Sequence, residues 1–380
     1  MHVYFDHNAT TAPDERVLEA MLPFLKGEYG NASSRHELGT RARKAVNRAR
    51  EQVARLVNVQ ASQVVFVSGG TEANNLFIKG AAAYLKSTQV VVSGIEHPCV
   101  AKPAQDLARQ GWKLRKIAVR PNGLVDLADV DAALADPTGL VSVMLANNET
   151  GVIQPVGEIA AKARAKRTWM HTDAVQALGK IPVDFEALGV HAMTISAHKI
   201  YGPKGAGALV VDKRLELKPI IHGGGHEMGL RSGTENVPAI VGFGAACELA
   251  AQRMDNISRK LQELRDRTDQ GVLALGAVIF GQGAPRIPNT TYFAFPHIDG
   301  ETLVIELDKA GFAVASGAAC SSTSTEPSAT LLAMGVAPEL ARGAVRVSFG
   351  VHNTAGQVEE FLQALSAVLN RLRRLTAIAV

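Results

Sequence analysis

Short apolar segments alternate along this chain with amphipathic stretches of helical periodicity, and this alternation limits the possible folds more than any other feature. Six apolar runs have the length of single strands: 64–67, 90–93, 140–145, 168–172, 192–196 and 208–211. Most are apolar throughout rather than at every second position, so both faces of each strand should be covered. The pattern predicts an α/β protein with a mainly parallel sheet between helices.

The helical stretches repeat apolar residues at three- and four-residue steps. Ala42, Val46, Ala49 and Val53 follow this spacing. A long helix is predicted over 237–266, a shorter one over 300–310 and a final one after Asn353, with short strands over 277–280 and 290–295. Because the pattern changes after residue 260, we predict a large domain over 13–261 and a small α+β domain formed by 1–12 and 262–380.

Composition excludes several classes of protein. The 380 residues are 47% hydrophobic and 20% charged, with a net charge of +4, which is too weak for a nucleic-acid footprint. No apolar run approaches the ~18 residues of a membrane span, and the first residues lack the features of a secretory signal. The cysteines Cys99, Cys247 and Cys320 cannot form a disulfide framework. We therefore expect a cytoplasmic protein without direct nucleic-acid or membrane binding, and no metal site is predicted.

Polar residues follow the ends of the predicted strands, the edge at which open α/β sheets bind their ligands. Gly70 and Thr71 lie where a helix should begin, so they form either a tight turn or an anion-binding helix N-terminus. Asp173 either caps a short helix over 174–178 or faces the ligand crevice, which Gln176 would also reach. The common position of these groups favours a site.

Lys199 ends the segment Ser196-Ala-His198-Lys199 and precedes a Gly-Pro loop. A lysine there is either a solvated surface residue or, where partial desolvation lowers its pKa, a Schiff-base nucleophile. His97 is either a hydrogen-bonded structural residue or a ring that stacks on an aromatic cofactor. Asn148 is in a turn or contacts a ligand, and the segment 231–234 with Thr234 forms an anion site or simply a loop.

The three cysteines have different surroundings. Cys247 lies in an apolar helical run and is predicted to be inert core. Cys99, two residues after His97, either lies near the site or is structural, and we predict the structural role. Cys320 lies among small polar residues over 315–328, which favours a loop that presents a reactive thiol.

Arg346 lies on a predicted strand over 344–349 with alternating character. Val345, Val347 and Phe349 share one face, so Arg346 points to the other. A guanidinium fixed in this way either binds a carboxylate through two hydrogen bonds or forms a salt bridge at a sheet edge.

Taken in chain order, these segments resemble the cysteine desulfurases related to NifS and IscS, which are class-V aminotransferases among the fold-type I pyridoxal-phosphate (PLP) enzymes. The resemblance covers nearly the whole chain. It is carried by Asp6-His-Asn-Ala-Thr-Thr11, Gly30-Asn-Ala-Ser-Ser34, Gly70-Thr-Glu72, Glu96-His97, Asn147-Asn-Glu-Thr-Gly151, His171-Thr-Asp-Ala-Val-Gln176, Ser196-Ala-His-Lys-Ile-Tyr-Gly-Pro-Lys-Gly205, Arg231-Ser-Gly-Thr234, Ser316-Gly-Ala-Ala-Cys320, Glu326-Pro-Ser328 and Arg346.

The resemblance implies the fold-type I architecture, with a seven-stranded sheet in the large domain, and a homodimer that uses PLP. The implied cofactor-binding residues are Gly70, Thr71, His97, Asp173, Gln176, Ser196, His198, Lys199 and, from the partner subunit, Thr234. Lys199 would hold the cofactor covalently, Asp173 would pair with its ring nitrogen and His97 would stack on the ring. Gln176 would face the phenolic oxygen. The phosphate would be bound by Thr71, Ser196, His198 and Thr234.

The implied reaction converts L-cysteine to L-alanine. Asn148 and Arg346 would hold the substrate carboxylate, and Lys199 would move the α-proton. Cys320 would take the sulfur as a persulfide and pass it to an acceptor protein, such as an iron–sulfur scaffold. The implied catalytic residues are therefore Cys320, Lys199 and His97.

Other activities stay open at this point. A selenocysteine lyase or another class-V enzyme, such as a transaminase, shares the cofactor site, although a transaminase has no use for Cys320. A non-catalytic PLP-containing or sulfur-carrying partner protein is a third possibility. Ala318 and His7 replace residues more frequent in the family, and the chain ends soon after its final helix, without the extension of IscS-type members. The acceptor is therefore left open.

Overall fold

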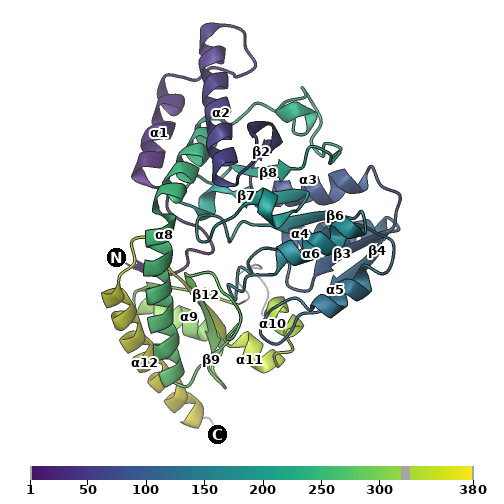
Figure 1. The fold of residues 1–380 in the computed structure, drawn as a ribbon. Helices are drawn as coiled ribbons and strands as arrows, with labels where there is room; N and C mark the ends of the chain where they lie inside the picture. Colours follow the sequence, from purple (N-terminus) through teal and green to yellow (C-terminus); the bar gives the residue numbers. More distant parts are fainter. Residues whose placement is uncertain (1, 318–325, 379–380) are drawn as a thin grey trace.

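The computed structural model describes residues 2–317 and 326–378, and a seven-stranded sheet forms the centre of this part of the chain (Figure 1). Its strands are β2 (Val64–Val67), β3 (Gln89–Ser93), β4 (Lys113–Ile117), β5 (Thr138–Ser142), β6 (Trp169–Asp173), β7 (Ala192–Ser196) and β8 (Gly207–Val211). They are ordered β2-β8-β7-β6-β5-β3-β4. β8 pairs antiparallel with β2 and β7, whereas the other pairs are parallel. The predicted mainly parallel seven-stranded sheet is confirmed.

Two strands differ from the sequence prediction. β4 is absent from the prediction because this edge strand has the polar sequence Lys-Leu-Arg-Lys-Ile and is largely open to solvent. β5 ends at Ser142 rather than at Leu145. The chain beyond Ser142 still follows β6, since Val143 N donates to His171 O (3.1 Å) and Leu145 N donates to Asp173 O (2.9 Å).

Helices cover both faces of this sheet (Figure 1). The helices of the described residues are α1 (Glu15–Lys26), α2 (Glu37–Leu56), α3 (Gly70–Ala82), α4 (Pro98–Arg109), α5 (Leu127–Ala133), α6 (Val156–Ala165), α7 (Phe185–Leu188), α8 (Val237–Ala274), α9 (Gly300–Lys309), α10 (Ala329–Ala333), α11 (Pro338–Arg342) and α12 (Ala355–Ile378), with short 3₁₀ turns at Ala61–Gln63, Ala197–Lys199 and Glu227–Gly229.

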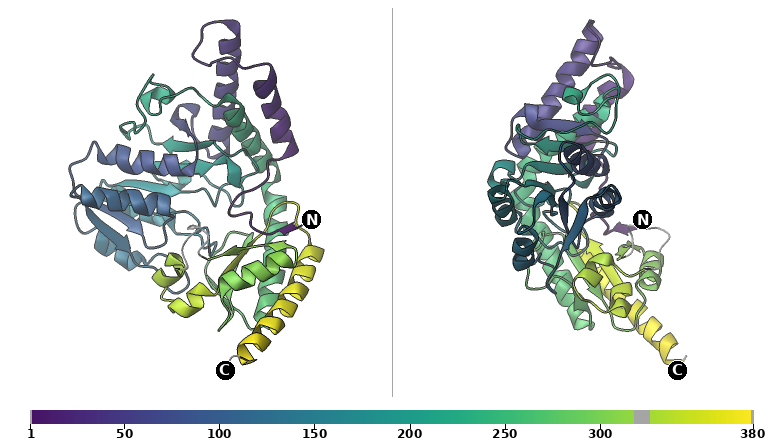
Figure 2. Two further views of the ribbon diagram at one scale, coloured as in Figure 1. Left: turned by 180° about the vertical axis from the view of Figure 1, so that it is seen from behind. Right: turned by 90° about the vertical axis from the view of Figure 1, so that its right-hand side faces the viewer.

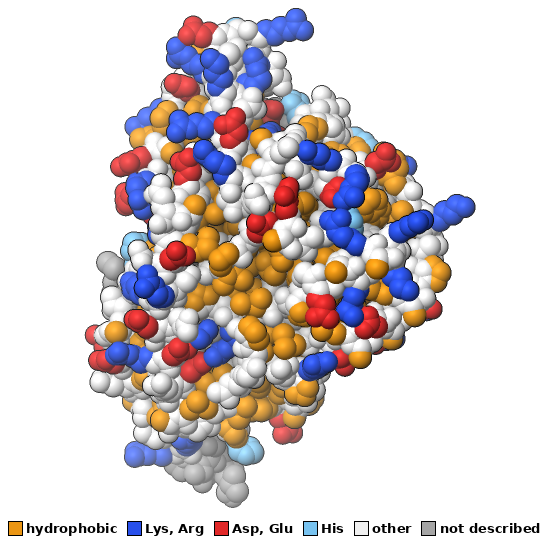
Figure 3. Space-filling view, in the orientation of Figure 1, with side chains coloured by type: hydrophobic (Ala, Val, Ile, Leu, Met, Phe, Trp, Pro, Cys, Tyr) orange, Lys and Arg blue, Asp and Glu red, His pale blue; other side chains and the backbone are white. Residues whose placement is uncertain are grey.

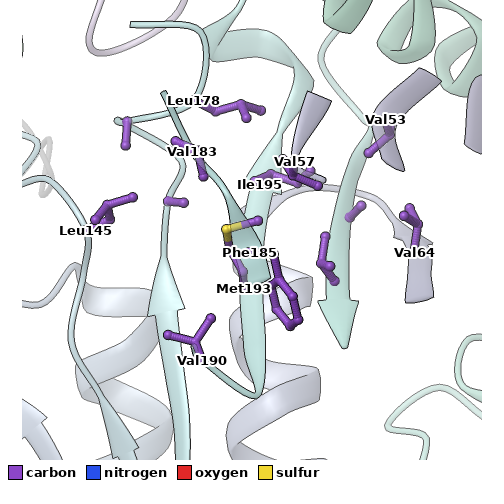
Figure 4. Packing of buried hydrophobic residues seen from close by; sticks show 14 of the residues in the cluster. Val53, Val57, Val64, Leu145, Leu178, Val183, Phe185, Val190, Met193 and Ile195 are labelled. Carbon is purple, nitrogen blue, oxygen red and sulfur yellow. The ribbon is translucent and has the colours of Figure 1, made fainter. Parts of the chain in front are cut away.

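Alternate residues of each strand enter different apolar clusters, as the pleat requires. Val64 and Phe66 pack in a cluster with α2, α6 and the first half of α8, part of which is drawn in Figure 4. Val65 and Val67 pack in a second cluster with α3 and α4. Both faces of these strands are therefore buried, which explains why their sequences are apolar throughout.

A smaller antiparallel sheet lies below the large one in Figure 1. Its order is β12-β13-β10-β9, from the strands β9 (Val278–Ile279), β10 (Thr290–Ala294), β12 (Ala315–Ser316) and β13 (Ala344–Ser348). The apolar cluster on this sheet includes residues of α9, α12 and the second half of α8, such as Leu261 and Leu264. Asp299 caps α9 by accepting from Thr302 N (2.8 Å).

α8 crosses residue 261 without a break and extends eight residues beyond the predicted end at 266. Its two halves pack in different apolar clusters. The division into domains 13–261 and 1–12 with 262–380 stays a prediction.

The N-terminal segment joins the two sheets. β1 (Val3–Tyr4) pairs with β11 (Phe312–Ala313), and Asp6 forms a bridge with Ser348 of β13. A few residues later, Thr11 N donates to His198 O (2.9 Å), next to the end of β7. The segment between these contacts therefore runs past the carboxyl ends of the large sheet's strands.

The molecule is elongated, with α1 and part of α2 projecting at one end and the end of α12 at the other (Figure 2). Among the described helices, none combines the length and the apolar character that a membrane crossing requires.

Candidate active site

A cavity of about 350 Å³ lies at the carboxyl ends of the strands of the large sheet. It brings together ten of the residues predicted from the sequence: Gly70, Thr71, His97, Asn148, Asp173, Gln176, Ser196, His198, Lys199 and Arg346. Thr234 is exposed and does not line this cavity. Cys320 lies outside the described residues.

One wall of the cavity suits a phosphate group. α3 begins at Gly70 without a side-chain cap, so its first N–H groups are available to an anion. The Thr71 side chain lines the same cavity and forms a hydrogen bond with Cys99. Ser196 Oγ is buried and has no hydrogen-bond partner in the part of the chain that is described. Burial, followed by Lys199, lowers the pKa of His198 to about 4, so this ring is neutral at pH 7. A buried hydroxyl that lines the same cavity as a helix N-terminus suits an anionic ligand.

Asp173 ends β6 with its carboxylate buried at the cavity. Asp173 Oδ2 accepts from Asn74 Nδ2 (2.7 Å), and Oδ1 accepts from Val175 N (3.0 Å). Residues 175–180 form turns, so the alternative that Asp173 caps a helix over 174–178 is wrong. A buried carboxylate with these two donors can still accept a proton-bearing ring nitrogen from the cavity.

His97 is the N-cap of α4 and contacts Cys99. His97 Nδ1 accepts from Cys99 N (3.2 Å) and lies 2.8 Å from Cys99 Sγ, to which Asn74 Nδ2 donates (2.9 Å). Since Nδ1 accepts from a backbone N–H, the proton of the neutral ring is on Nε2. Burial lowers the pKa of His97 and raises that of Cys99 to about 12. His97 is therefore an uncharged ring, and Cys99 is a thiol at the cavity wall rather than a thiolate.

Lys199 follows β7 in the 3₁₀ turn Ala197–Lys199. Its Nζ donates to the carbonyl oxygens of Asn8 and Ala9, the latter at 2.7 Å. The N-terminal segment therefore holds the amine at the cavity, so the alternative of a fully solvated surface lysine does not describe it.

Arg346 lies on β13, between β12 and β10, so it is not on an edge strand. Its Nη2 donates to Asp6 Oδ1 (2.6 Å) and its Nη1 donates to Asn148 O (3.0 Å). Nε is buried without a partner among the described residues. The guanidinium is thus fixed in place and retains donor capacity for an anion.

Glu149, next to Asn148, connects the cavity to the segment after residue 326. Its carboxylate accepts from Ser328 Oγ, from Thr330 Oγ1 (2.7 Å) and from Tyr292 OH (3.1 Å). Ser328 is also the N-cap of α10. The motif Glu326-Pro-Ser328 is therefore anchored beside a residue of the cavity.

Sequence reasoning missed three polar residues of this region. Asn8 lines the cavity and contacts Thr290 and Ser348 of the small sheet. Asn74 supports Asp173, and Lys180 is buried behind Gln176. Spacing offered a signal for two of them: Asn74 is one helical turn after Gly70, and Lys180 is four residues after Gln176. Asn8 lies inside the motif Asp6–Thr11, but nothing in the sequence shows what it contacts.

Comparisons with known proteins agree with this geometry. The family model described as aminotransferase class-V matches residues 3–361. The chain is 43% identical over 376 residues to "Cysteine desulfurase IscS 1" of Archaeoglobus fulgidus, covering 98% of both chains. The solved structure of a "NifS-like protein" is 38% identical, with a TM-score of 0.92 over 97% of this chain and 100% of that one. The structure "SspA in complex with cysteine" is 31% identical, with a TM-score of 0.80 over 92% and 99% of the two chains.

Proposed function

The chain belongs to the class-V aminotransferase family, and from this premise we propose how its residues carry out the reaction of a cysteine desulfurase of the NifS and IscS type. It is a PLP-dependent enzyme that converts L-cysteine to L-alanine and retains the sulfur. Relatives that carry the name cysteine desulfurase favour this activity over a selenocysteine lyase or a transaminase.

A single observation supports the assignment of the site most strongly: one cavity is lined by Lys199, Asp173, the start of α3 and the Ser196 hydroxyl, which has no partner among the described residues. These are the groups needed to hold an aldehyde, a pyridine nitrogen and a phosphate. PLP therefore fits the residues present. Gln176 and His97 line the same cavity, and we assign them to the phenolic oxygen and to the ring face.

When bound, PLP supplies an electron sink for the electrons of the α-carbon. Asp173 keeps the proton on the ring nitrogen. Arg346 and Asn148 orient the substrate carboxylate. Lys199 holds the cofactor and then moves the α-proton.

Cys320 completes the proposed reaction. Its thiolate forms an S–S bond with the substrate sulfur while the substrate C–S bond breaks, with the electron pair going to carbon. That carbon is protonated and leaves as alanine. The proposal rests on the sequence context of Cys320 and on the surroundings of the other two cysteines, neither of which suits a nucleophile. Cys247 is fully buried in the core, and Cys99 holds its proton.

We propose a homodimer in which Thr234 contributes to the partner's phosphate site. Thr234 is exposed and lies outside the cavity of its own chain. Hydrophobic side chains gather in the middle of the face shown in Figure 3, and α1 exposes Leu18, Leu22 and Leu25. Apolar surface of this kind is typical of protein interfaces. A sulfur-acceptor protein, such as an iron–sulfur scaffold, and a cytoplasmic location complete the proposal.

The test is incubation with L-cysteine and a thiol reductant, with alanine and sulfide measured together. The native protein should release both in equal amounts. Lys199→Ala should lose the absorbance of bound PLP, and Cys320→Ala should lose alanine formation by a factor of about 100 or more, equivalent to about 2.7 kcal/mol. Cys247→Ala, a matched change in the core, should keep the activity. Alanine formation by Cys320→Ala at the native rate would refute the persulfide step.

A further inference from the structure

Lys180 is buried behind the cavity, and the proposed reaction does not use it. Its side-chain nitrogen donates to Gln176 Oε1 (2.7 Å) and to Asn8 Oδ1 (3.0 Å). Gln176 and Asn8 both line the cavity, whereas Lys180 does not. A fully buried amine is costly unless it is well paired. Its position behind two residues of the cavity therefore calls for an explanation.

The contacts of Lys180 determine which end of the Gln176 amide points at it. A neutral amine has two hydrogens and an ammonium has three, so Lys180 can donate to both oxygens in either state. The other end of the amide is also specified, because Gln176 Nε2 donates to Asn8 O (2.9 Å), a group that only accepts. In the described part of the chain this is the bond that Nε2 makes, so its second hydrogen is available to a ligand in the cavity.

Asn8 is itself held in one orientation. Its Nδ2 donates to Thr290 Oγ1 (2.8 Å) and to Asn148 O (3.2 Å). Its Oδ1 therefore faces the donors Lys180 Nζ and Asn289 Nδ2, each at 3.0 Å. Lys180 thus lies between two amides whose orientations agree with each other.

We propose that Lys180 is a positioning residue, which fixes the Gln176 amide so that Nε2, rather than Oε1, faces the phenolic oxygen of the bound cofactor. The inference rests on the proposed function, because it takes PLP as the ligand of the cavity. An N–H donor at this oxygen stabilises its deprotonated form, whereas a carbonyl oxygen there would repel it.

Lys180 also acts on its surroundings through charge, and the experiment must separate this effect. Burial, Lys199 and Arg346 lower the pKa of Lys180. In turn, Lys180 contributes to the lowered pKa values of His7 and His198. A direct effect of charge on the cofactor does not pass through Gln176, so it should persist when the Gln176 side chain is removed.

The test is a pH titration of the visible absorbance of the PLP-loaded protein for the native chain, Lys180→Met, Gln176→Ala and the double variant. Lys180→Met should raise the midpoint by about half to one pH unit, the effect of weakening one hydrogen bond. In the Gln176→Ala background the same change should shift the midpoint by less than about a third of that amount. An equal shift in both backgrounds, or no shift in the native background, would overturn the proposal.

Two further variants sharpen this test. Asn289→Ala removes the other donor to Asn8 Oδ1, and Asn289 does not contact Gln176, so the midpoint should stay at the native value. A shift equal to that of Lys180→Met would show that the effect comes from the orientation of Asn8 rather than that of Gln176. Lys180→Gln keeps a shorter donor and should give an intermediate shift. If Lys180→Met does not fold, Lys180→Gln takes its place in the comparison with and without the Gln176 side chain, and the same results support or overturn the proposal. A native protein that binds no PLP would instead contradict the proposed function itself.

Discussion

Replacement of Arg346 by lysine tests the assignment of the substrate carboxylate site. The Arg346 side chain is only 6% exposed, and Asp6 and Asn148 hold it by Nη2 and Nη1. A lysine keeps the charge and can still pair with Asp6, but it cannot bind a carboxylate through a planar fork. The substitution should therefore remove the grip on L-cysteine while leaving a cation in the same place.

The magnitude follows from the hydrogen bonds at stake. A hydrogen bond to a charged group contributes about 1.5–3 kcal/mol, which corresponds to a loss of about 10- to 150-fold in kcat/KM for L-cysteine. Most of the loss should be in KM, because the carboxylate is held equally before and during the reaction. The absorbance of bound PLP should be unchanged, since Arg346 is not assigned to the cofactor. Steady-state alanine formation over a range of cysteine concentrations measures both constants.

Arg286 offers a matched control. It is similarly buried, at 9% exposed, and pairs with Asp269 near the small sheet, away from the cavity. Arg286→Lys should destabilise the fold about as much as Arg346→Lys does, without raising the KM for L-cysteine. The assignment is refuted if Arg346→Lys is folded and has the native KM, or if Arg286→Lys raises KM as much.

Two predictions concern stability, measured by chemical and thermal unfolding. Burial lowers the pKa of His171 to about 3 from an unfolded value of 6.5. As the pH falls below 6.5 the unfolded state therefore binds the proton first, and the stability that is present above pH 6.5 is lost. Between pH 8 and 5 the free energy of unfolding should fall by about 2 kcal/mol more in the native protein than in His171→Gln, and equal decreases would contradict this. Glu227 accepts from Arg50 Nη1 (2.6 Å) and Nη2 (2.7 Å), so Glu227→Gln should cost about 3–5 kcal/mol by leaving a buried charge. As a control, Glu37→Gln at the exposed ion pair with Arg41 should lower the free energy of unfolding by less than about 0.5 kcal/mol. Similar losses for Glu227→Gln and Glu37→Gln would show that burial of the ion pair does not determine its contribution to stability.

Much of the fold was predictable because its strands are buried on both faces and therefore apolar over their whole length. β4 was not predictable, since an edge strand with the sequence Lys-Leu-Arg-Lys-Ile lacks a continuous apolar run. The helix predicted over 174–178 is a turn. A run of five residues is too short for hydrophobic periodicity to distinguish a helix from a turn. Asp173 and Lys199 were found because each comes after a strand predicted from the sequence, and parallel strands end at one edge.

The amino-acid sequence by itself determined which side chains stand at the ends of the strands, because strand length and direction follow from local apolar patterns. Only the tertiary structure decided how the remote parts of the chain complete the cavity. Arg346 meets Asp6 across 340 positions, and Asn8 meets Thr290 across 282. Lys180 meets Asn8 in the same way, across 172 positions, through the passage of the N-terminal segment between the two sheets. Contacts of this kind depend on how the sheets pack against each other, and no local pattern in the sequence encodes them.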